Sequence, residues 1–291
     1  MFIDVHAHAY RLPGPPQDGR TTFCQVDQLL TRWDELGVER GVVLPLIGPE
    51  VYLPQANEDI LEMAEQTDGR IIPFCNIDPR GIRNSPDAPL DIWLRHYKEK
   101  GCKGVGEFMP NLPFNHPLVL NLFAHAEALE LPVTFDTSDR IGGTYGLYAD
   151  PGMAQFEECL QRFPRLKFFG HGPEFWAEIA ALDPPGHRSG YPNHPVREEG
   201  VVPRLFREYG TLYGDLSAGS GANALMRDPD YAVRFLNEFQ DRLMFGTDVC
   251  AFEQELPLAA FLRDLLAQGK ITPAVFHKVA KDNAIRLLEL E

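Results

Sequence analysis

The chain has 291 residues, of which 44% are hydrophobic, and it carries a formal net charge of −15 at pH 7. This much apolar material excludes a disordered chain, and the length is close to the roughly 250 residues of a (β/α)₈ barrel. The acidic balance argues against nucleic acid and anionic membrane surfaces as partners, because both require a basic face that displaces counterions.

The cysteine pattern predicts reduced thiols rather than disulfides or a thiolate zinc site. Five cysteines are widely spaced, and no CxxC pair occurs among them. We find no apolar run of about 18 residues and no secretory signal at the start. The expectation is therefore a cytoplasmic protein that acts on a small molecule without a membrane, with a homo-oligomer left open. The cysteines are Cys24, Cys75, Cys102, Cys159 and Cys250.

Short apolar segments alternate with helical segments along the chain. Most of the apolar segments are continuously hydrophobic, which is typical of parallel strands buried on both faces. The predicted strands are FIDVH (2–6), GVVLPL (41–46), IIPFCNI (71–77), KGVGEF (103–108), PVTFDT (132–137), LKFFGH (166–171), TLYGDLS (211–217) and RLMFGTD (242–248).

The segments between the strands show helical spacing of apolar residues. In CQVDQLLTRWDELG, for example, Leu29, Trp33 and Leu36 recur on one helical face. Eight strand–helix units without a break predict an α/β fold, a (β/α)₈ TIM barrel, as one domain over residues 1–291. We expect a long insertion at about 183–200 between strands 6 and 7, and closing helices at about 256–289, one over 256–268 and one over 272–289.

Polar residues stand at the ends of the predicted strands, where barrels of this type place their active sites. His6 and His8 lie two residues apart, so their side chains share a face of the first strand. Imidazole and carboxylate ligands without thiolate suit Zn²⁺, with Mn²⁺, Fe²⁺ or Ni²⁺ as alternatives. The other strand-end residues are Glu107, Asp136, His171, Asp215, Ser217 and Asp248.

Several motifs carry a resemblance to a known family. DVHAH on strand 1, GHGP on strand 6, GTD on strand 8 and the closing KDNAIRLL segment resemble the amidohydrolase superfamily. The closest branch is amidohydrolase-2, with its metal-dependent hydrolases and aminocarboxymuconate-semialdehyde-type decarboxylases. The stretches HGPEFWAEI and YGDLSAGSGANAL are also similar to those of an uncharacterised subgroup of predicted hydrolases. The resemblance spans the whole chain and is specific for fold and metal chemistry, but not for substrate.

The resemblance implies a role for each matching residue. His6 and His8 match the metal ligands of the HxH motif, and Asp248 matches the aspartate that binds metal and handles the proton of the bound water. His171 matches a histidine that is a ligand in two-metal relatives and polarises water or substrate in one-metal relatives. Glu107 stands where relatives place a ligand or a bridge between metals.

One position departs from the family pattern. Relatives read LPVxxH at strand 5, whereas this chain reads LPVTFD, so Asp136 replaces a histidine. Two interpretations follow: Asp136 binds the metal as a carboxylate, or Glu107 takes that place. Asp136 as a carboxylate that only orients a ligand is a third.

Candidate substrate contacts lie in the segments after the strands. The glycine-rich stretch GDLSAGSGAN lets the backbone approach a ligand closely, although it is also typical of a helix cap. Trp176 either walls the pocket or packs against the next helix. Arg140 and Arg188 are candidates for binding a substrate carboxylate. The predicted substrate-binding residues are Ser217, Ser220, Asn223, Trp176 and Arg140.

Three functions are weighed. The first is a metal-dependent hydrolase that acts on a small-molecule ester, lactone or amide, with Asp248 and His171 as catalytic residues. The second is a metal-dependent lyase, a decarboxylase or hydratase of an unsaturated or aromatic carboxylic acid. The third is a non-catalytic metal-binding barrel, which the proton-transfer groups at residues 171 and 248 disfavour.

Overall fold

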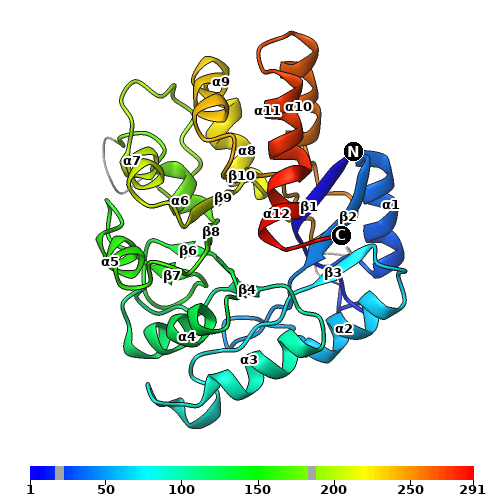
Figure 1. Ribbon diagram of the computed structural model, residues 1–291, viewed down its shortest axis with the longest axis vertical. Coiled ribbons are helices and arrows are strands. Elements are labelled where there is room, and N and C mark those ends of the chain that lie inside the picture. Colours follow the sequence, from blue (N-terminus) through cyan, green and yellow to red (C-terminus); the bar gives the residue numbers. More distant parts are fainter. Residues whose placement is uncertain (17–22, 183–187) are drawn as a thin grey trace.

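Parallel strands lie in the middle of the molecule with helices around them (Figure 1). This computed structural model describes residues 1–16, 23–182 and 188–291, so the first part of the predicted insertion at 183–200 lies outside the described residues. Each predicted strand overlaps an observed strand. The barrel strands are β1 (Phe2–Ala7), β2 (Val38–Val43), β3 (Ile71–Pro73), β4 (Val105–Phe108), β5 (Val133–Phe135), β8 (Phe168–Gly170), β9 (Leu212–Asp215) and β10 (Leu243–Met244).

The strands form two parallel sheets that meet at both edges. One sheet has the order β1-β2-β3 and the other the order β10-β9-β8-β5-β4. Beyond β3, the Cys75 amide donates to the Gly104 carbonyl at 3.0 Å. Beyond β10, the Asp248 amide donates to the His6 carbonyl at 2.7 Å, and the Val5 amide donates to the Phe245 carbonyl at 3.1 Å. These bonds link the two sheets into a ring, and the predicted barrel fold is confirmed.

The helices follow the predicted apolar spacing. In the first of them, Leu29 and Trp33 are buried and Gly37 ends the helix with a φ of 71°, a value that glycine adopts without strain. The helices are α1 (Val26–Leu36), α2 (Asn57–Glu65), α3 (Leu90–Glu99), α4 (Pro117–Ala128), α5 (Ala154–Arg162), α6 (Pro173–Ala177), α7 (Val201–Glu208), α8 (Ala218–Met226), α9 (Pro229–Glu238), α10 (Leu258–Ala267), α11 (Pro273–His277) and α12 (Asn283–Leu287).

The loop after β5 and the closing segment differ from expectation, and the glycine-rich stretch begins a helix. Strands β6 (Thr137–Ser138) and β7 (Leu147–Tyr148) pair within the long loop after β5. The closing segment, expected as one helix over 272–289, contains a π-helical turn, Lys278–Asp282, between α11 and α12. The glycine-rich stretch forms α8. A Cβ on Gly221 would meet the Leu216 carbonyl oxygen at 2.3 Å, so this glycine permits helix–strand packing.

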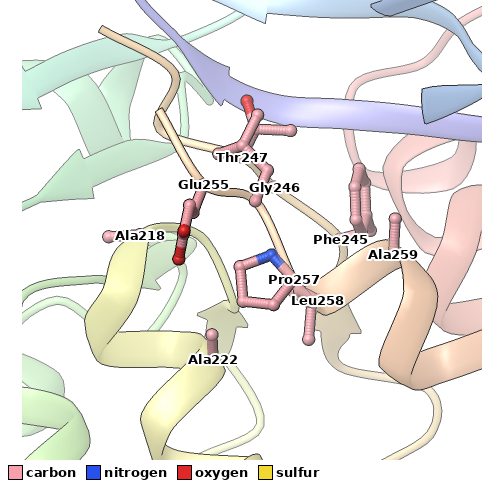
Figure 2. Close-up of a pocket in the computed structure, with 10 residues that line it drawn as sticks. Ala218, Ala222, Phe245, Gly246, Thr247, Glu255, Pro257, Leu258 and Ala259 are labelled. Atoms are coloured by element: carbon pink, nitrogen blue, oxygen red, sulfur yellow. The ribbon is translucent and has the colours of Figure 1, made fainter. Parts of the chain in front are cut away.

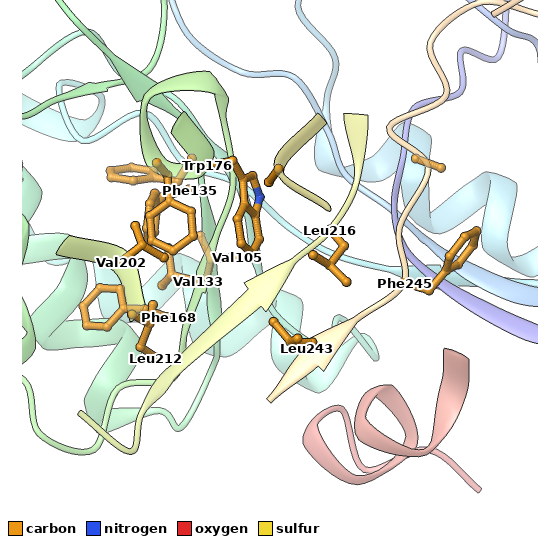
Figure 3. Close-up of a cluster of buried hydrophobic side chains, with 14 of the residues drawn as sticks. Val105, Val133, Phe135, Phe168, Trp176, Val202, Leu212, Leu216, Leu243 and Phe245 are labelled. Carbon is orange, nitrogen blue, oxygen red and sulfur yellow. The ribbon is translucent and has the colours of Figure 1, made fainter. Parts of the chain in front are cut away.

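Two apolar layers leave one end of the barrel polar. Phenylalanines of β5, β8 and neighbouring helices pack between strands and helices (Figure 3). Inside the barrel, Val5, Val42 and Phe169 pack with Leu287 of α12. Lys167, just before β8, donates to the Leu287 carbonyl, so α12 covers the amino end of the strands. The polar groups of the barrel therefore lie at the opposite end, where the strands have their carboxyl ends.

Within the described residues, we find no helix with the length and apolarity needed to cross a membrane.

Candidate active site

The two histidines of β1 meet at the carboxyl end of the barrel because the strand contains a bulge. Asp4 lies opposite Gly41, but Ala7 lies opposite Val43, so β1 has one residue more than β2 over this stretch. The shift lets Asp4 turn outward to Trp33 of α1 at 2.9 Å. His6, only two residues later, turns inward, and its Nε2 lies 3.1 Å from Nε2 of His8.

Hydrogen bonds behind the two rings assign their protons. Nδ1 of His8 lies 3.0 Å from the Leu44 carbonyl, which can only accept, so Nδ1 carries a hydrogen. Nδ1 of His6 lies 2.7 Å from a carboxylate oxygen of Asp215 and donates in the same way. In the neutral rings both Nε2 atoms therefore present lone pairs to one point. This is the arrangement that histidine ligands of a metal require.

Carboxylates complete a set of ligand atoms around that point. Oδ1 of Asp248 lies 3.5 Å from Nε2 of His6 and 3.3 Å from Nε2 of His8. Oε2 of Glu107 lies 3.7 and 3.4 Å from the same two atoms. Two atoms bound at about 2.1 Å to one Zn²⁺ at tetrahedral angles lie roughly 3.4 Å apart. The spacing fits ligands that share one small cation.

The backbone at Asp248 is held in an uncommon conformation. Its φ is 51°, in the left-handed region that costs free energy for residues other than glycine. The backbone amide of Asp248 donates to the His6 carbonyl, and the backbone carbonyl of Asp248 accepts from the Gln254 side chain at 2.8 Å. These bonds fix the carboxylate toward the two rings.

The pKa values of His8 and Glu107 reflect the negative charge of the carboxylates around the two Nε2 atoms. Burial acts to lower the pKa of His8, but hydrogen bonds to Asp248 and Glu107 outweigh it and raise the pKa to about 9. Burial acts to raise the pKa of Glu107, but the two histidines outweigh it and hold it well below its usual range. The field that attracts a proton to the rings also attracts a divalent cation.

Asp136 and His171 form a second group next to the first. One oxygen of Glu107, one of Asp136 and one ring nitrogen of His171 lie within 4.8 Å of one another. Burial and the nearby Glu107 carboxylate raise the pKa of Asp136 well above its usual range. Burial, together with the neighbouring His6, lowers the pKa of His171. Its Nδ1 lies 2.9 Å from the Ser217 hydroxyl.

Two buried residues that the sequence did not single out position the ligands. The Asp4 carboxylate accepts from the amides of His6 and Thr247 and from the Thr247 hydroxyl, which ties β1 to the segment that carries Asp248. The Asn76 side chain donates to the Glu107 carbonyl at 2.6 Å. In the sequence, the signal for each residue was its position as a polar residue inside an apolar strand segment, Asp4 in FIDVH and Asn76 in IIPFCNI.

A cavity of about 210 Å³ opens beside this cluster. Loops after several barrel strands form its wall, and the catalytic candidates lie on it. The lining residues are His8, Phe23, Leu46, Glu50, Val51, Tyr52, Glu107, Met109, Asp136, Tyr145, His171, Pro173, Tyr191, Ala218, Ser220, Asp248 and Cys250.

Of the five predicted substrate contacts, only Ser220 lies on the wall. Ser217 is buried behind His171. Trp176 is 1% exposed and donates its indole N–H to the Asp215 carbonyl at 2.8 Å, so it packs in the core. Asn223 donates to the Pro192 carbonyl at 2.9 Å and holds the loop before α7. Arg140 is exposed and pairs with Asp139 at 3.3 Å. None of these four side chains is among the described residues that line the cavity.

Arg188 is also engaged away from the cavity. Its guanidinium pairs with Glu178 at 2.9 Å and donates to the Ala149 carbonyl at 2.7 Å. The side chain is 3% exposed, so it docks the loop before α7 onto the loop after β7. It does not line the cavity as an anchor for a substrate carboxylate.

A second cavity lies between the starts of α8 and α10 (Figure 2). Ala218, Thr247 and Pro257 are among its lining residues, and its volume is about 10 Å³. A space of this size holds about one water molecule. It therefore offers no second ligand site.

Solved structures with similar folds are full-length matches at low identity. An uncharacterised TIM-barrel protein from Bordetella bronchiseptica is 17% identical, with coverage of 99% of this chain and 98% of that one and a TM-score of 0.66. The 5-carboxyvanillate decarboxylase LigW from Sphingomonas paucimobilis is 17% identical, with coverage of 100% and 99% and a TM-score of 0.63. An amidohydrolase from Burkholderia multivorans with bound zinc is 15% identical, with coverage of 100% of both chains and a TM-score of 0.62.

The family itself is shown by the sequence. No curated protein matches the chain. A family model described as amidohydrolase, however, matches residues 3–290. Because that match covers nearly the whole chain, the protein belongs to the amidohydrolase family.

Proposed function

We propose that this protein is a metal-dependent hydrolase that acts on a small-molecule ester, lactone or amide. The observation that carries the proposal is the convergence of the Nε2 atoms of His6 and His8 with the Asp248 carboxylate at one point beside the cavity. A divalent cation bound there, for which Zn²⁺ is the best match to the donors, supplies a Lewis acid and a water whose pKa is lowered toward about 7.

The surrounding residues would divide the remaining work. Asp248 accepts the proton of the attacking water and returns it to the leaving group, because its carboxylate is held next to both rings and lines the cavity. His171, which lines the cavity, interacts with the substrate oxygen on which negative charge develops. Asp215 and Leu44 hold the two imidazoles in the ligating tautomer.

Hydrolysis is favoured over decarboxylation by the surroundings of the cavity. A decarboxylase of this kind must anchor a substrate carboxylate. The two candidate anchors, Arg140 and Arg188, are paired with Asp139 and Glu178 instead. Among the described residues on the cavity wall, none is a lysine or an arginine.

Metal removal tests the proposal. Exhaustive chelation should abolish turnover of a responsive ester, lactone or amide, and zinc or manganese should restore it. His6→Ala should lose bound metal in elemental analysis. Asp248→Asn should lower kcat by about 10²–10⁴-fold, because the proton acceptor is lost. His96→Ala, on the exposed face of α3, is the matched control and should keep both metal and activity.

Two results would contradict the proposal. Turnover that survives complete metal removal would exclude the metal-dependent mechanism. Release of carbon dioxide from a hydroxybenzoate library, with no ester, lactone or amide cleaved, would assign the site to the lyase class.

A further inference from the structure

The wall of the cavity next to the proposed metal centre is built from aromatic residues of several loops. Phe23 follows β1, Tyr52 follows β2, Tyr145 lies in the loop before β7, and Tyr191 lies before α7. Each of the three tyrosines is about half exposed, with exposed fractions of 54%, 52% and 47%. Aromatic rings that are half exposed around a cavity can stack on a planar ligand.

One side of this wall is rigid. The Phe23 ring stacks on the Tyr10 ring at 4.4 Å and faces the Tyr52 ring at 6.0 Å with an interplanar angle of 26°. The Tyr10 hydroxyl donates to the Leu53 carbonyl at 2.7 Å, which ties the first loop to the second. Leu46 and Met109 pack with Tyr10 as a small apolar cluster apart from the main core. A preformed apolar surface of this kind favours binding because little side-chain entropy is lost.

The charge of the wall disfavours anionic ligands. Its described carboxyl groups are those of Glu50, Glu107, Asp136 and Asp248, and none of its described residues is a lysine or an arginine. The His8 imidazole on the wall lies 3.4 Å from a Glu107 oxygen and 3.3 Å from an Asp248 oxygen, so these carboxylates balance any positive charge on it. Glu50 is neutralised from behind by Arg80, whose two terminal nitrogens each lie 2.7 Å from a Glu50 oxygen. Arg80 also pairs with Asp78, so its charge does not serve the cavity. Away from the metal centre, a second negative group on the ligand would meet no described cation on the wall.

The volume has room for one aromatic ring. An apolar cavity of about 150 Å³ binds benzene. The cavity here, at about 210 Å³, accommodates one aromatic ring with a short substituent that reaches the metal centre.

We propose that this cavity selects substrates that carry a single uncharged aromatic ring, such as aryl esters, aryl lactones or aromatic amides without a free carboxylate. Tyr52, Tyr145 and Tyr191 are the residues that determine this specificity. The identity of the bond that is broken rests on the proposed function, but the ligand class rests on the cavity alone.

Binding of ligands that cannot be hydrolysed tests the inference separately from catalysis. The probes are acetophenone, cyclohexyl methyl ketone and benzoate, titrated by saturation-transfer NMR into metal-free protein, so that benzoate cannot gain affinity from a metal. Acetophenone should bind about tenfold more tightly than benzoate, and about two- to tenfold more tightly than the saturated ketone.

Variants assign the preference to the wall. Tyr145→Leu and Tyr191→Leu keep apolar bulk but remove the ring, and each should reduce the preference for acetophenone over the saturated ketone by about two- to fivefold. Trp93→Leu, which removes an exposed aromatic residue on α3, is the matched control and should leave all three affinities unchanged.

The outcomes separate this inference from the proposed reaction. Benzoate that binds as tightly as acetophenone, or tyrosine variants that bind as the parent does, would overturn the ligand class. The expected binding pattern without any hydrolysis would support the ligand class and count against the reaction. In the zinc-loaded enzyme, phenyl acetate should have a kcat/KM about tenfold above that of 4-carboxyphenyl acetate, with the tyrosine variants raising KM rather than lowering kcat.

Discussion

At the scale of single residues, the site depends on what stands behind each imidazole. The Leu44 carbonyl accepts a hydrogen bond from Nδ1–H of His8, and the Asp215 carboxylate accepts one from Nδ1–H of His6. Both Nε2 atoms are therefore left to face a cation. Asp215 also lies 3.5 Å from Nδ1 of His171, whose hydrogen-bond partner is the Ser217 hydroxyl. It is buried and absent from the cavity wall. Asp215 is thus a positioning residue.

Asp215→Asn should weaken zinc binding by about 10–100-fold, because an amide orients His6 but no longer enhances its basicity. Competition with a chromophoric chelator measures the affinity. Asp241→Asn, on an exposed residue paired with Lys278, is the control and should bind zinc as the parent does. An unchanged affinity in Asp215→Asn would show that the negative charge behind His6 has no influence on zinc binding.

At the scale of elements, ion pairs join the loops that carry the site. Arg80, after β3, binds Glu50 in the loop after β2, and Glu50 accepts from the Asn111 amide in the loop after β4. Arg188 docks the loop before α7 by its buried pair with Glu178. These ion pairs therefore help to hold the loops around the cavity in position.

The contribution of Arg80 should depend on pH. Burial acts to raise the pKa of Glu50, but hydrogen bonds from Arg80 and the Asn111 amide outweigh it and lower the pKa. A lowered pKa means that the stabilisation is present above the usual range of glutamate and is lost as the pH falls through the lowered value. Arg80→Met should cost about 1–3 kcal/mol near pH 7, and less near pH 4.

Urea denaturation of both proteins at the two pH values measures this difference. Arg165→Met, which removes an exposed pair with Glu127, should cost less than about 1 kcal/mol at both. A cost for Arg80→Met that does not change with pH would show that the charge of Glu50 is not what Arg80 stabilises.

At the scale of the whole molecule, the polar end of the barrel is supported by an aromatic core on one flank. Phe168 of β8 lies between strands and helices, with its ring 5.1 Å from Phe123 and 5.5 Å from Phe156. All three side chains are fully buried. The strands that carry Glu107, Asp136 and His171 pack on this core, so their relative positions depend on it.

Phe168→Ala should lower the free energy of unfolding by about 3–5 kcal/mol, since it removes a buried ring and leaves a cavity. Chemical denaturation at a fixed zinc concentration measures the change, because bound metal itself adds to apparent stability. Trp93→Ala, whose side chain is 45% exposed, should change stability by less than about 1 kcal/mol. Equal effects of the two substitutions would show that the core around Phe168 relaxes to fill the space.

The sequence by itself determined the barrel and the set of polar residues at its carboxyl end. Eight continuously apolar segments in alternation with helices allow few other folds, and parallel strands bring their carboxyl ends to one rim. The sequence alone therefore predicts that six polar residues lie near one another: His6, His8, Glu107, Asp136, His171 and Asp248. Their roles as ligands and catalytic groups remain predictions.

Only the tertiary structure decided which side chains face the cavity. The bulge in β1 separates Asp4 from His6, although strand alternation places them on one face. Ser220 reaches the wall whereas Ser217 turns to His171, and the tyrosines of three loops converge on one space. Side-chain direction at a bulge and the course of a loop depend on contacts between residues far apart in the chain. Local sequence patterns do not specify those contacts.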